Sequence, residues 1–195
     1  MAFISPEIRK QLHIKLSNVR LAYPRVFEPV ENSLSGNLEY SCQIRLYKSN
    51  PDHMKQVEKL RAAMKVAAKA FWGNDAERNM RAALDSTNTR WLREDPDGEY
   101  YFVNLTRRSQ DGAPRVVARD HTVNLRPEDG KIYGGAFVTA IFDLWCYSNS
   151  SKGFSATLMG LQFVADGDPI GGASVAKDED FDDLSAEDGD GNDFI

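Results

Sequence analysis

The chain has few of the residues that build disulfide scaffolds, metal centres and membrane-spanning segments. Its 195 residues include two cysteines and three histidines. Two distant cysteines exclude a disulfide scaffold and a cysteine-rich zinc site, and they are typical of a reducing compartment. No apolar stretch reaches the length that crosses a membrane. The N-terminus also lacks the basic segment and long apolar run of a signal peptide. We therefore expect a soluble intracellular protein without a membrane partner.

The patterns that catalytic sites leave in a sequence are scarce. No glycine-rich loop has phosphate-binding spacing, and no serine lies in a nucleophile elbow. The pair Asp120-His121 is compatible with metal or acid–base chemistry, but a turn at a strand end explains it more simply. We predict a protein that is not an enzyme and needs no cofactor or metal. A metal-dependent nuclease that uses Asp120 and His121 remains an alternative.

Basic residues are absent from the last eighteen positions, which hold nine of the 29 carboxylates. The segment ends in Asp193, Phe194 and Ile195, and solvation of an acidic run gives no reason for this apolar tip. We predict that residues 176–195 form a disordered acidic tail that carries a docking peptide. The first 177 residues hold 24 basic and 20 acidic residues, a net charge of +4. A basic body beside an acidic tail suggests a surface that binds a polyanion, with the tail competing for the same surface. A tail that only increases solubility fits the charge distribution equally well.

The first strand is predicted at residues 13–23, and its pattern contains a fault. Apolar residues alternate in one phase up to Leu16 and in the opposite phase from Val19. One extra residue at 17–18 would reconcile the two phases, which predicts a β-bulge there. Proline cannot donate a hydrogen bond to a sheet, so we expect Pro24 to end the strand and a loop to follow.

A helical segment of about residues 51–85 follows a second strand at 38–47. Asn50 and Pro51 are typical of a helix start, and apolar residues recur at helical spacing up to Phe71. We expect His53, near the helix start, to lie on the surface. Cations away from the apolar stripe form a solvated face or, less often, a phosphate-contacting stripe; they are Lys55, Lys59, Arg61, Lys65 and Lys69.

Strands dominate the remaining sequence. They are predicted at 100–107, 115–120, 133–147 and 154–164, and the last two form a hairpin. Two strands, a helical insertion and four strands predict one mainly β domain, α+β by content, over residues 1–175. The long bent strand favours a small antiparallel barrel, and an open α+β sheet is the alternative.

Two strands carry a second face that mixes aromatic with polar residues. Tyr100 and Phe102 lie on one such face, and Trp145 and Tyr147 lie on the other. Cations flank both strands, namely Arg107, Arg108, Arg115, Arg119 and Lys152. Unpaired bases stack on aromatic rings while cations contact phosphates, so this pattern predicts a surface for single-stranded nucleic acid. The alternative is that the helical insertion covers the rings, which would then form a second core.

Four segments of the chain match the pattern of a known protein family, and their order and spacing together make the match fairly specific. They are Asn18–Pro24 with Phe27, Tyr133–Val138, Lys152–Phe163 and Asp166–Gly172. In these segments the chain resembles a family of bacteriophage single-stranded DNA-binding proteins from phage replication clusters. The resemblance covers nearly the whole body of the chain.

The resemblance implies an OB-fold barrel that binds single-stranded DNA without sequence preference in the cytoplasm of the bacterial host. It also implies that the acidic tail recruits replication or recombination proteins and competes with DNA for the binding groove. The tip Asp193, Phe194 and Ile195 would be the docking element. The related bacterial tails carry proline before a final phenylalanine, and this tip does not, so a phage-encoded partner is as plausible as a host one. Self-association is left open.

A second hypothesis is an interaction protein whose acidic tail mimics nucleic acid and blocks a host DNA-binding enzyme. The placement of charge separates the two hypotheses. A mimic carries acidic residues on its folded surface, whereas here they are concentrated in the tail.

Overall fold

The computed structural model describes residues 4–33, 35–85, 91–149 and 151–170. The expected disordered tail and its tip lie outside these residues. No helix in the described part is long and apolar enough to cross a membrane. The described α-helices and β-strands are α1 (Pro6–Leu12), β1 (His13–Glu31), β2 (Leu38–Tyr47), α2 (Pro51–Trp72), α3 (Ala76–Asp85), β3 (Arg93–Glu94), β4 (Tyr100–Arg108), β5 (Arg115–Val117), β6 (Phe137–Ser148) and β7 (Lys152–Ala165).

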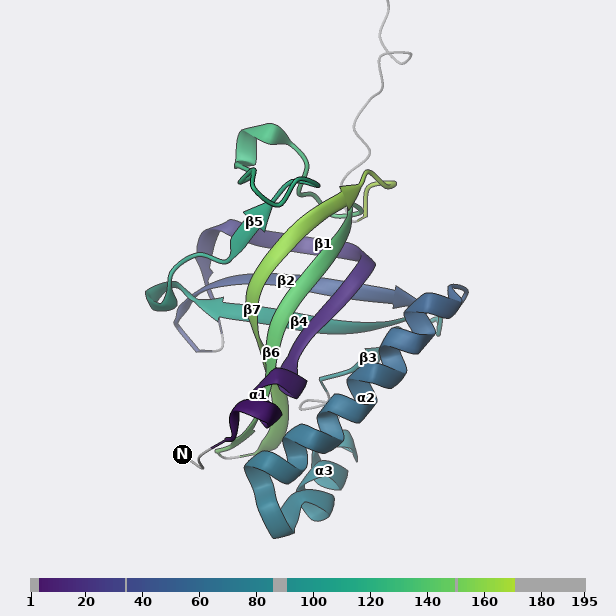
Figure 1. Ribbon diagram of the computed structural model, residues 1–195, viewed down its shortest axis with the longest axis vertical. Helices are drawn as coiled ribbons and strands as arrows, with labels where there is room; N and C mark the ends of the chain where they lie inside the picture. The colour runs from purple at the N-terminus through teal and green to yellow at the C-terminus, as the bar shows by residue number, and fades with distance from the viewer. Residues whose placement is uncertain (1–3, 34, 86–90, 150, 171–195) are drawn as a thin grey trace, which may run out of the picture.

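Five of the strands close into a barrel. Strands β1, β2, β4, β7 and β6 are neighbours in that order, β6 pairs with β1, and a parallel contact between Thr106 and Thr157 joins β4 to β7. Figure 1 shows β1, β6 and β7 side by side in one layer, with β2 and β4 crossing behind them. The predicted mainly β, OB-fold-like barrel with a helical insertion is confirmed, and the open sheet is not formed.

Strand β1 bends, so that it belongs to both layers of the barrel. Its first part, from His13 to Arg20, pairs with β6, and its second part, from Arg20 to Glu31, pairs with β2. The register with β6 shifts between Leu16 and Val19, and Asn18 has a φ of 53°. The predicted bulge is therefore confirmed, and it supplies the local bend that a closed barrel needs.

Pro24 does not end β1, so the predicted strand end and the loop after it were wrong. The pairing with β2 runs from Ala22 with Gln43 to Arg25 with Ser41, and it skips the two residues between. Tyr23 has a φ of 48°. Because Tyr23 and Pro24 form a second bulge, the missing N–H of the proline leaves no unpaired acceptor in the ladder.

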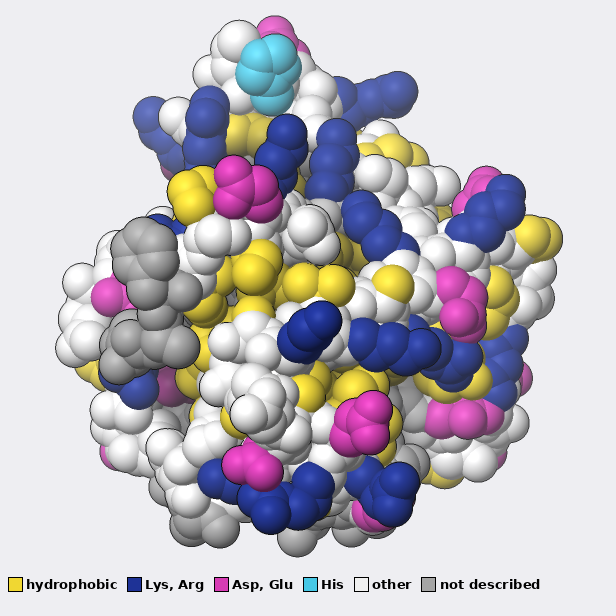
Figure 2. Space-filling model, turned by 60° about the horizontal axis from the view of Figure 1, so that its bottom comes forward, with side chains coloured by type: hydrophobic (Ala, Val, Ile, Leu, Met, Phe, Trp, Pro, Cys, Tyr) yellow, Lys and Arg dark blue, Asp and Glu magenta, His cyan; other side chains and the backbone are white. Residues whose placement is uncertain are grey.

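The helical insertion covers the interior of the barrel from one end. Asn50 caps α2 by accepting a hydrogen bond from the backbone N–H of Asp52 at 2.9 Å. Val57, Leu60 and Met64 of α2 join the buried core. Figure 1 shows α2 and α3 at the end of the molecule away from β5. In Figure 2 that end comes forward, and hydrophobic side chains gather in the middle of the face with Lys and Arg around them.

His53 is buried, with 3% of its surface exposed, so the predicted surface position was wrong. Its Nδ1 accepts a hydrogen bond from the backbone N–H of Tyr47 at 2.9 Å, and its Nε2 donates to the Asn18 carbonyl at 2.9 Å. The side chain thus ties α2 to β2 and to the first bulge of β1. Helical position alone gave no sign of these long-range partners.

Several boundaries also differ from the sequence prediction. Helix α1 and the short β3 were not predicted, and β5 ends at Val117 rather than at residue 120. Helix α1 begins after Ser5, whose side chain accepts a hydrogen bond from Ile8 N. The strand predicted from residue 133 begins at Phe137, because the preceding glycines form a tight crossing described next.

Gly134 and Gly135 fix the segment that follows β7, and we call residues 134–135 with 166–170 the glycine clamp. Gly135 has a φ of 118°, and a Cβ there would lie 2.1 Å from the carbonyl oxygen of Asp168. The N–H of Ile170 donates to the Gly134 carbonyl at 2.7 Å. Arg20 donates from Nη2 to the Asp168 carbonyl at 2.6 Å. Only glycine allows this approach of two backbones.

Candidate nucleic-acid interface

The outward faces of β4 and β6 are opposite the core, as the alternation predicts. In β4, Val103 and Leu105 are fully buried, whereas Tyr100 and Phe102 are half-buried. In β6, the even-numbered residues 138–146 are buried, whereas 37% of Trp145 is exposed. These rings are therefore partly exposed, and stacking of an unpaired base requires an accessible aromatic ring.

The helical insertion packs on the other side of β4. Tyr101, which points away from Tyr100 and Phe102, lies under the guanidinium of Arg61 on α2, with 5.4 Å between the guanidinium carbon and the ring centre. The aromatic neighbours of Tyr100 are Tyr47 and Phe102 from the sheet itself. The alternative in which the helices cover the rings is therefore not the arrangement of the described residues.

Tyr100 and Phe102 belong to a cluster that we call the tyrosine–arginine platform, made of Tyr23, Arg45, Tyr47, Tyr100 and Phe102. The guanidinium carbon of Arg45 lies 4.7 Å from the ring centre of Tyr100 and 5.5 Å from that of Tyr23. The ring centres of Tyr47 and Tyr100 are 5.3 Å apart. A cation between two rings holds them in place and keeps a positive charge next to any bound base.

Arg45 is buried to 9% exposure by these rings. Its Nε donates to Gln43 Oε1 at 2.9 Å, and its Nη2 donates to the Tyr23 hydroxyl at 3.3 Å. Burial raises the pKa of the Tyr100 hydroxyl, although the charge of Arg45 acts in the opposite direction. Tyr100 therefore stays neutral at physiological pH, and the net positive charge of the platform is that of Arg45.

Tyr23 and Arg45 were not among the predicted site residues. Tyr23 is 56% exposed, and the bulge of β1 holds it in a left-handed conformation that a bulky residue rarely adopts. Arg45 lies opposite Phe102 in the β2–β4 register. The alternation of residues 38–47 places Arg45 on the polar face of this strand. Its role beside the aromatic residues could be predicted only with the knowledge that β4 pairs with β2.

Trp145 lines a hollow of about 380 Å³ between β4, β7 and β6, which we call the tryptophan hollow. Its indole Nε1 donates to Thr157 Oγ1 at 3.2 Å, which sets the orientation of the ring. Tyr147 meets Trp145 edge-on at 6.2 Å and lies over Gly153, where a Cβ would clash with its ring. The other residues lining the hollow are Glu39, Thr106, Arg107, Arg108, Asp111, Ser155 and Thr157.

The platform and the tryptophan hollow lie on one continuous face. Tyr100 belongs to the first and Thr106 to the second, and both point to the same side of β4 because their positions differ by an even number. Six residues of strand separate them by roughly 20 Å. The structure thus brings the four predicted aromatic residues into two pairs on one surface.

The two adjacent arginines of β4 have different surroundings. Arg107 donates from Nε to the Gly112 carbonyl at 2.7 Å and from Nη2 to the Asp111 carbonyl at 2.5 Å. Its guanidinium is thus occupied with the turn after β4. Arg108 is exposed at the rim of the tryptophan hollow, opposite Glu39 in the register. Of the pair, Arg108 is better placed to meet a phosphate.

The remaining predicted cations lie on the borders of this face. Arg115 lines a neighbouring hollow of about 230 Å³ with Ile141 and Met159, and it donates from Nη2 to the His121 carbonyl at 3.0 Å. Met159 Sδ is 3.5 Å from Arg107 Nη1, which links the two hollows. Arg119 is exposed, and Lys152 is half-buried at the far end of the β6–β7 hairpin.

Asp120 and His121 form a turn. The Asp120 carboxylate accepts hydrogen bonds from the backbone N–H of Thr122 at 2.9 Å and from its hydroxyl at 2.7 Å, and the backbone hydrogen bond is the main cause that lowers its pKa. In the described ranges, no group of three His, Cys, Asp or Glu side chains could hold a metal ion. Burial raises the pKa of the Cys42 and Cys146 thiols to about 12, so both are inert.

Comparison with known proteins places this chain in a family. Residues 12–194 match the family model described as the single-stranded DNA-binding protein of Enterobacter phage Enc34. The chain belongs to this family of phage proteins. A relative named putative protein p50, from Acyrthosiphon pisum secondary endosymbiont phage 1, is 37% identical over 177 residues, which cover 89% of this chain and 95% of that protein.

Solved structures share the fold at lower identity. The single-stranded DNA-binding protein of bacteriophage Enc34 superposes with a TM-score of 0.64 at 22% identity, covering 86% of this chain and 88% of that one. The same phage protein in complex with single-stranded DNA gives a TM-score of 0.63 at 21% identity, with 83% and 91% covered. The bacteriophage T7 protein gp2.5 gives 0.52 at 12% identity, with 94% and 98% covered.

Proposed function

We propose that the chain binds single-stranded DNA without sequence preference, across the face formed by the tyrosine–arginine platform and the tryptophan hollow. The observation that carries this proposal is the stacking of Arg45 against both Tyr23 and Tyr100, in a cluster of partly exposed aromatic rings. Each base stacked on an aromatic ring contributes about 1–3 kcal/mol, and every base offers such a face.

The position of the platform in the barrel supports this function. Nucleic acids bind OB-fold barrels on the face of the second and third barrel strands. Here these strands are β2 and β4, which carry Arg45, Tyr47, Tyr100 and Phe102. The Enc34 protein, described as bound to single-stranded DNA, shares this fold.

The predicted contacts divide into two classes. Stacking is assigned to Tyr100, Phe102, Trp145 and Tyr147, with Tyr23 added from the structure. Phosphate contacts are assigned to Arg108, Arg115, Arg119 and Lys152 and, more weakly, to Arg107, whose guanidinium holds the turn after β4. In this proposal the protein coats exposed strands during phage replication or recombination in the host cytoplasm, and the tip Asp193, Phe194 and Ile195 recruits partner proteins.

A titration of fluorescein-labelled oligo-dT at several salt concentrations tests the proposal. We expect binding at low salt, weaker binding to duplex DNA of the same length, and a slope of log K against log salt of roughly −3. This slope assumes about 0.7 per phosphate neutralised, for four or five cations. No binding at low salt, even with the chain shortened to residue 177, would contradict the proposal.

The shortened chain also tests the role of the tail as a competitor. Removing residues 178–195 removes nine carboxylates and no cations, so we expect a higher affinity for oligo-dT at low salt. The gain should disappear as salt rises, because added ions screen the tail from the binding face. An unchanged or lower affinity at low salt would show that the tail does not compete.

A further inference from the structure

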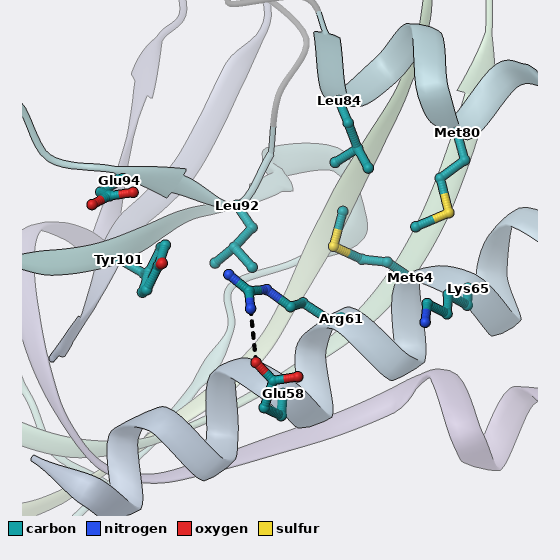
Figure 3. A pocket seen from close by; sticks show the side chains of 9 residues that line it. All are labelled: Glu58, Arg61, Met64, Lys65, Met80, Leu84, Leu92, Glu94 and Tyr101. Carbon is teal, nitrogen blue, oxygen red and sulfur yellow. Dashed lines mark hydrogen bonds and ion pairs between the residues drawn. The ribbon is translucent and has the colours of Figure 1, made fainter. Parts of the chain in front are cut away.

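A groove lies between α2 and α3, outside the proposed DNA-binding face. It consists of two hollows of about 410 and 500 Å³ that share Lys65 and Met80. We call it the helix groove. Its first hollow also contacts β3 and β4 through Glu94 and Tyr101 (Figure 3).

The floor of the helix groove is apolar and adaptable. In Figure 3 the side chains of Met64, Met80, Leu84 and Leu92 point toward one another, and Tyr101 lies at one end. Methionine has a flexible and polarisable side chain, so a floor with two methionines can accept an aromatic or branched aliphatic group. Methionine is frequent at binding surfaces that accept varied apolar groups.

Cations line one edge of the helix groove. Arg61, Lys65 and Lys69 are four residues apart on α2, so they lie on one face of the helix. Of the acidic residues at the groove, Glu58 pairs with Arg61 at 2.7 Å, Glu94 pairs with Lys48, and Glu77 lines the second hollow from α3. Among the ion pairs of the described residues, none involves Lys65 or Lys69. The edge is therefore suited to an acidic ligand.

We propose that the helix groove binds the C-terminal tip of this chain, with Phe194 and Ile195 on the apolar floor and the carboxylates of Asp193 and the C-terminus near Lys65 and Lys69. The last eighteen residues have nine carboxylates, no cations and this apolar end, which matches the groove in both charge and hydrophobicity. The 25 residues after Ile170 span up to about 80 Å when extended, so the tip can reach a groove at the far end of the molecule.

In this docked state the tip is bound to its own chain when no partner protein is present. A partner protein that binds the tip then has to displace it from the helix groove, so the docking weakens the recruitment of partners. The docking requires no DNA, and its failure would leave DNA binding by the β2–β4 face untouched.

Photo-crosslinking in the full-length protein tests the docking. p-Benzoylphenylalanine replaces Phe194, the protein is irradiated without DNA, and the crosslinked peptides are identified by mass spectrometry. We expect the crosslinks to concentrate on residues 61–84 and 91–94. The variant K65E/K69E should reduce their yield roughly five-fold or more, because two exposed charges of the required sign are reversed.

The matched control is K55E/K59E, which makes the same change in charge on the same helix. Lys55 and Lys59 are exposed, as Lys65 and Lys69 are, but they line a different hollow next to Lys15. We expect the control to retain the crosslinks. Crosslinks on other surfaces, or an equal loss in both variants, would overturn the proposal, since general attraction between tail and body would then explain the contacts.

Discussion

Replacing Tyr100 and Trp145 together by alanine is expected to lower the affinity for oligo-dT at least about 30-fold. Each ring lost removes about 1–3 kcal/mol of stacking, and the two rings belong to different ends of the binding face. The effects should be nearly additive because roughly 20 Å of strand separates the two sites. The fluorescence titration with oligo-dT measures the loss directly.

The matched control keeps flat rings at both positions. A Y100F/W145F protein loses one hydroxyl and one indole N–H but retains both stacking surfaces, so it should bind within a few-fold of the unchanged protein. Equal losses in the alanine and phenylalanine proteins would mean that stacking is not the source of affinity. Circular dichroism should be unchanged in both, since neither ring belongs to the barrel core.

Replacing Gly135 by alanine is expected to reduce the free energy of unfolding by about 3 kcal/mol or more. The residue has a φ of 118°, and the new Cβ would lie 2.1 Å from the Asp168 carbonyl oxygen. The cost combines backbone strain with the displacement of one backbone from another. A urea unfolding curve followed by tryptophan fluorescence measures the change.

Gly112→Ala is the control that measures the cost of backbone strain without a steric clash. Gly112 also has a positive φ, of 77°, but no atom lies within 4 Å of the new Cβ. We expect a loss of roughly 1 kcal/mol there. A comparable loss at both glycines would show that the glycine clamp tolerates the added carbon and does not hold the segment after β7.

The glycine clamp also matters for the binding face. A Cβ at Gly134 would lie 2.7 Å from the Ile170 carbonyl oxygen and 3.8 Å from the backbone nitrogen of Tyr23. The clamp therefore fixes the last described residues of the chain beside the bulge that presents Tyr23.

The local sequence pattern correctly predicted the features that are determined mainly by residues nearby in the sequence. The phase change between Leu16 and Val19 located the first bulge, and the cap at Asn50 located the start of α2. The alternation of β6 identified both its buried face and the exposed Trp145. In each case the signal lies within about ten residues of the feature it predicts.

Features that depend on distant partners were missed or left open. Barrel closure rests on the contact between Thr106 and Thr157, and nothing in either strand alone distinguishes it from an open sheet. His53 is buried because its two nitrogens meet backbone groups of Tyr47 and Asn18. Pro24 passes through a strand only because the ladder skips it.

In the candidate site, too, the features set by nearby residues were predicted and those set by distant partners were not. The alternation within β4 and β6 selected Tyr100, Phe102, Trp145 and Tyr147 correctly as residues of outward faces. The combination of Arg45 with Tyr23 and Tyr100 required three strands to be placed side by side. The different surroundings of Arg107 and Arg108 likewise depend on the carbonyl groups of the turn at residues 109–112, which sequence spacing does not orient.

Mapping of ultraviolet crosslinks between oligo-dT and the unmodified protein tests the central claim most directly. Mass spectrometry of the products identifies the residues that contact bases. We expect crosslinks at Tyr100, Phe102, Trp145 and Tyr147, with Tyr23 as a further site, and few on α2 or α3. Crosslinks confined to the helical insertion, with the outward faces of β4 and β6 unmodified, would contradict the proposed binding face.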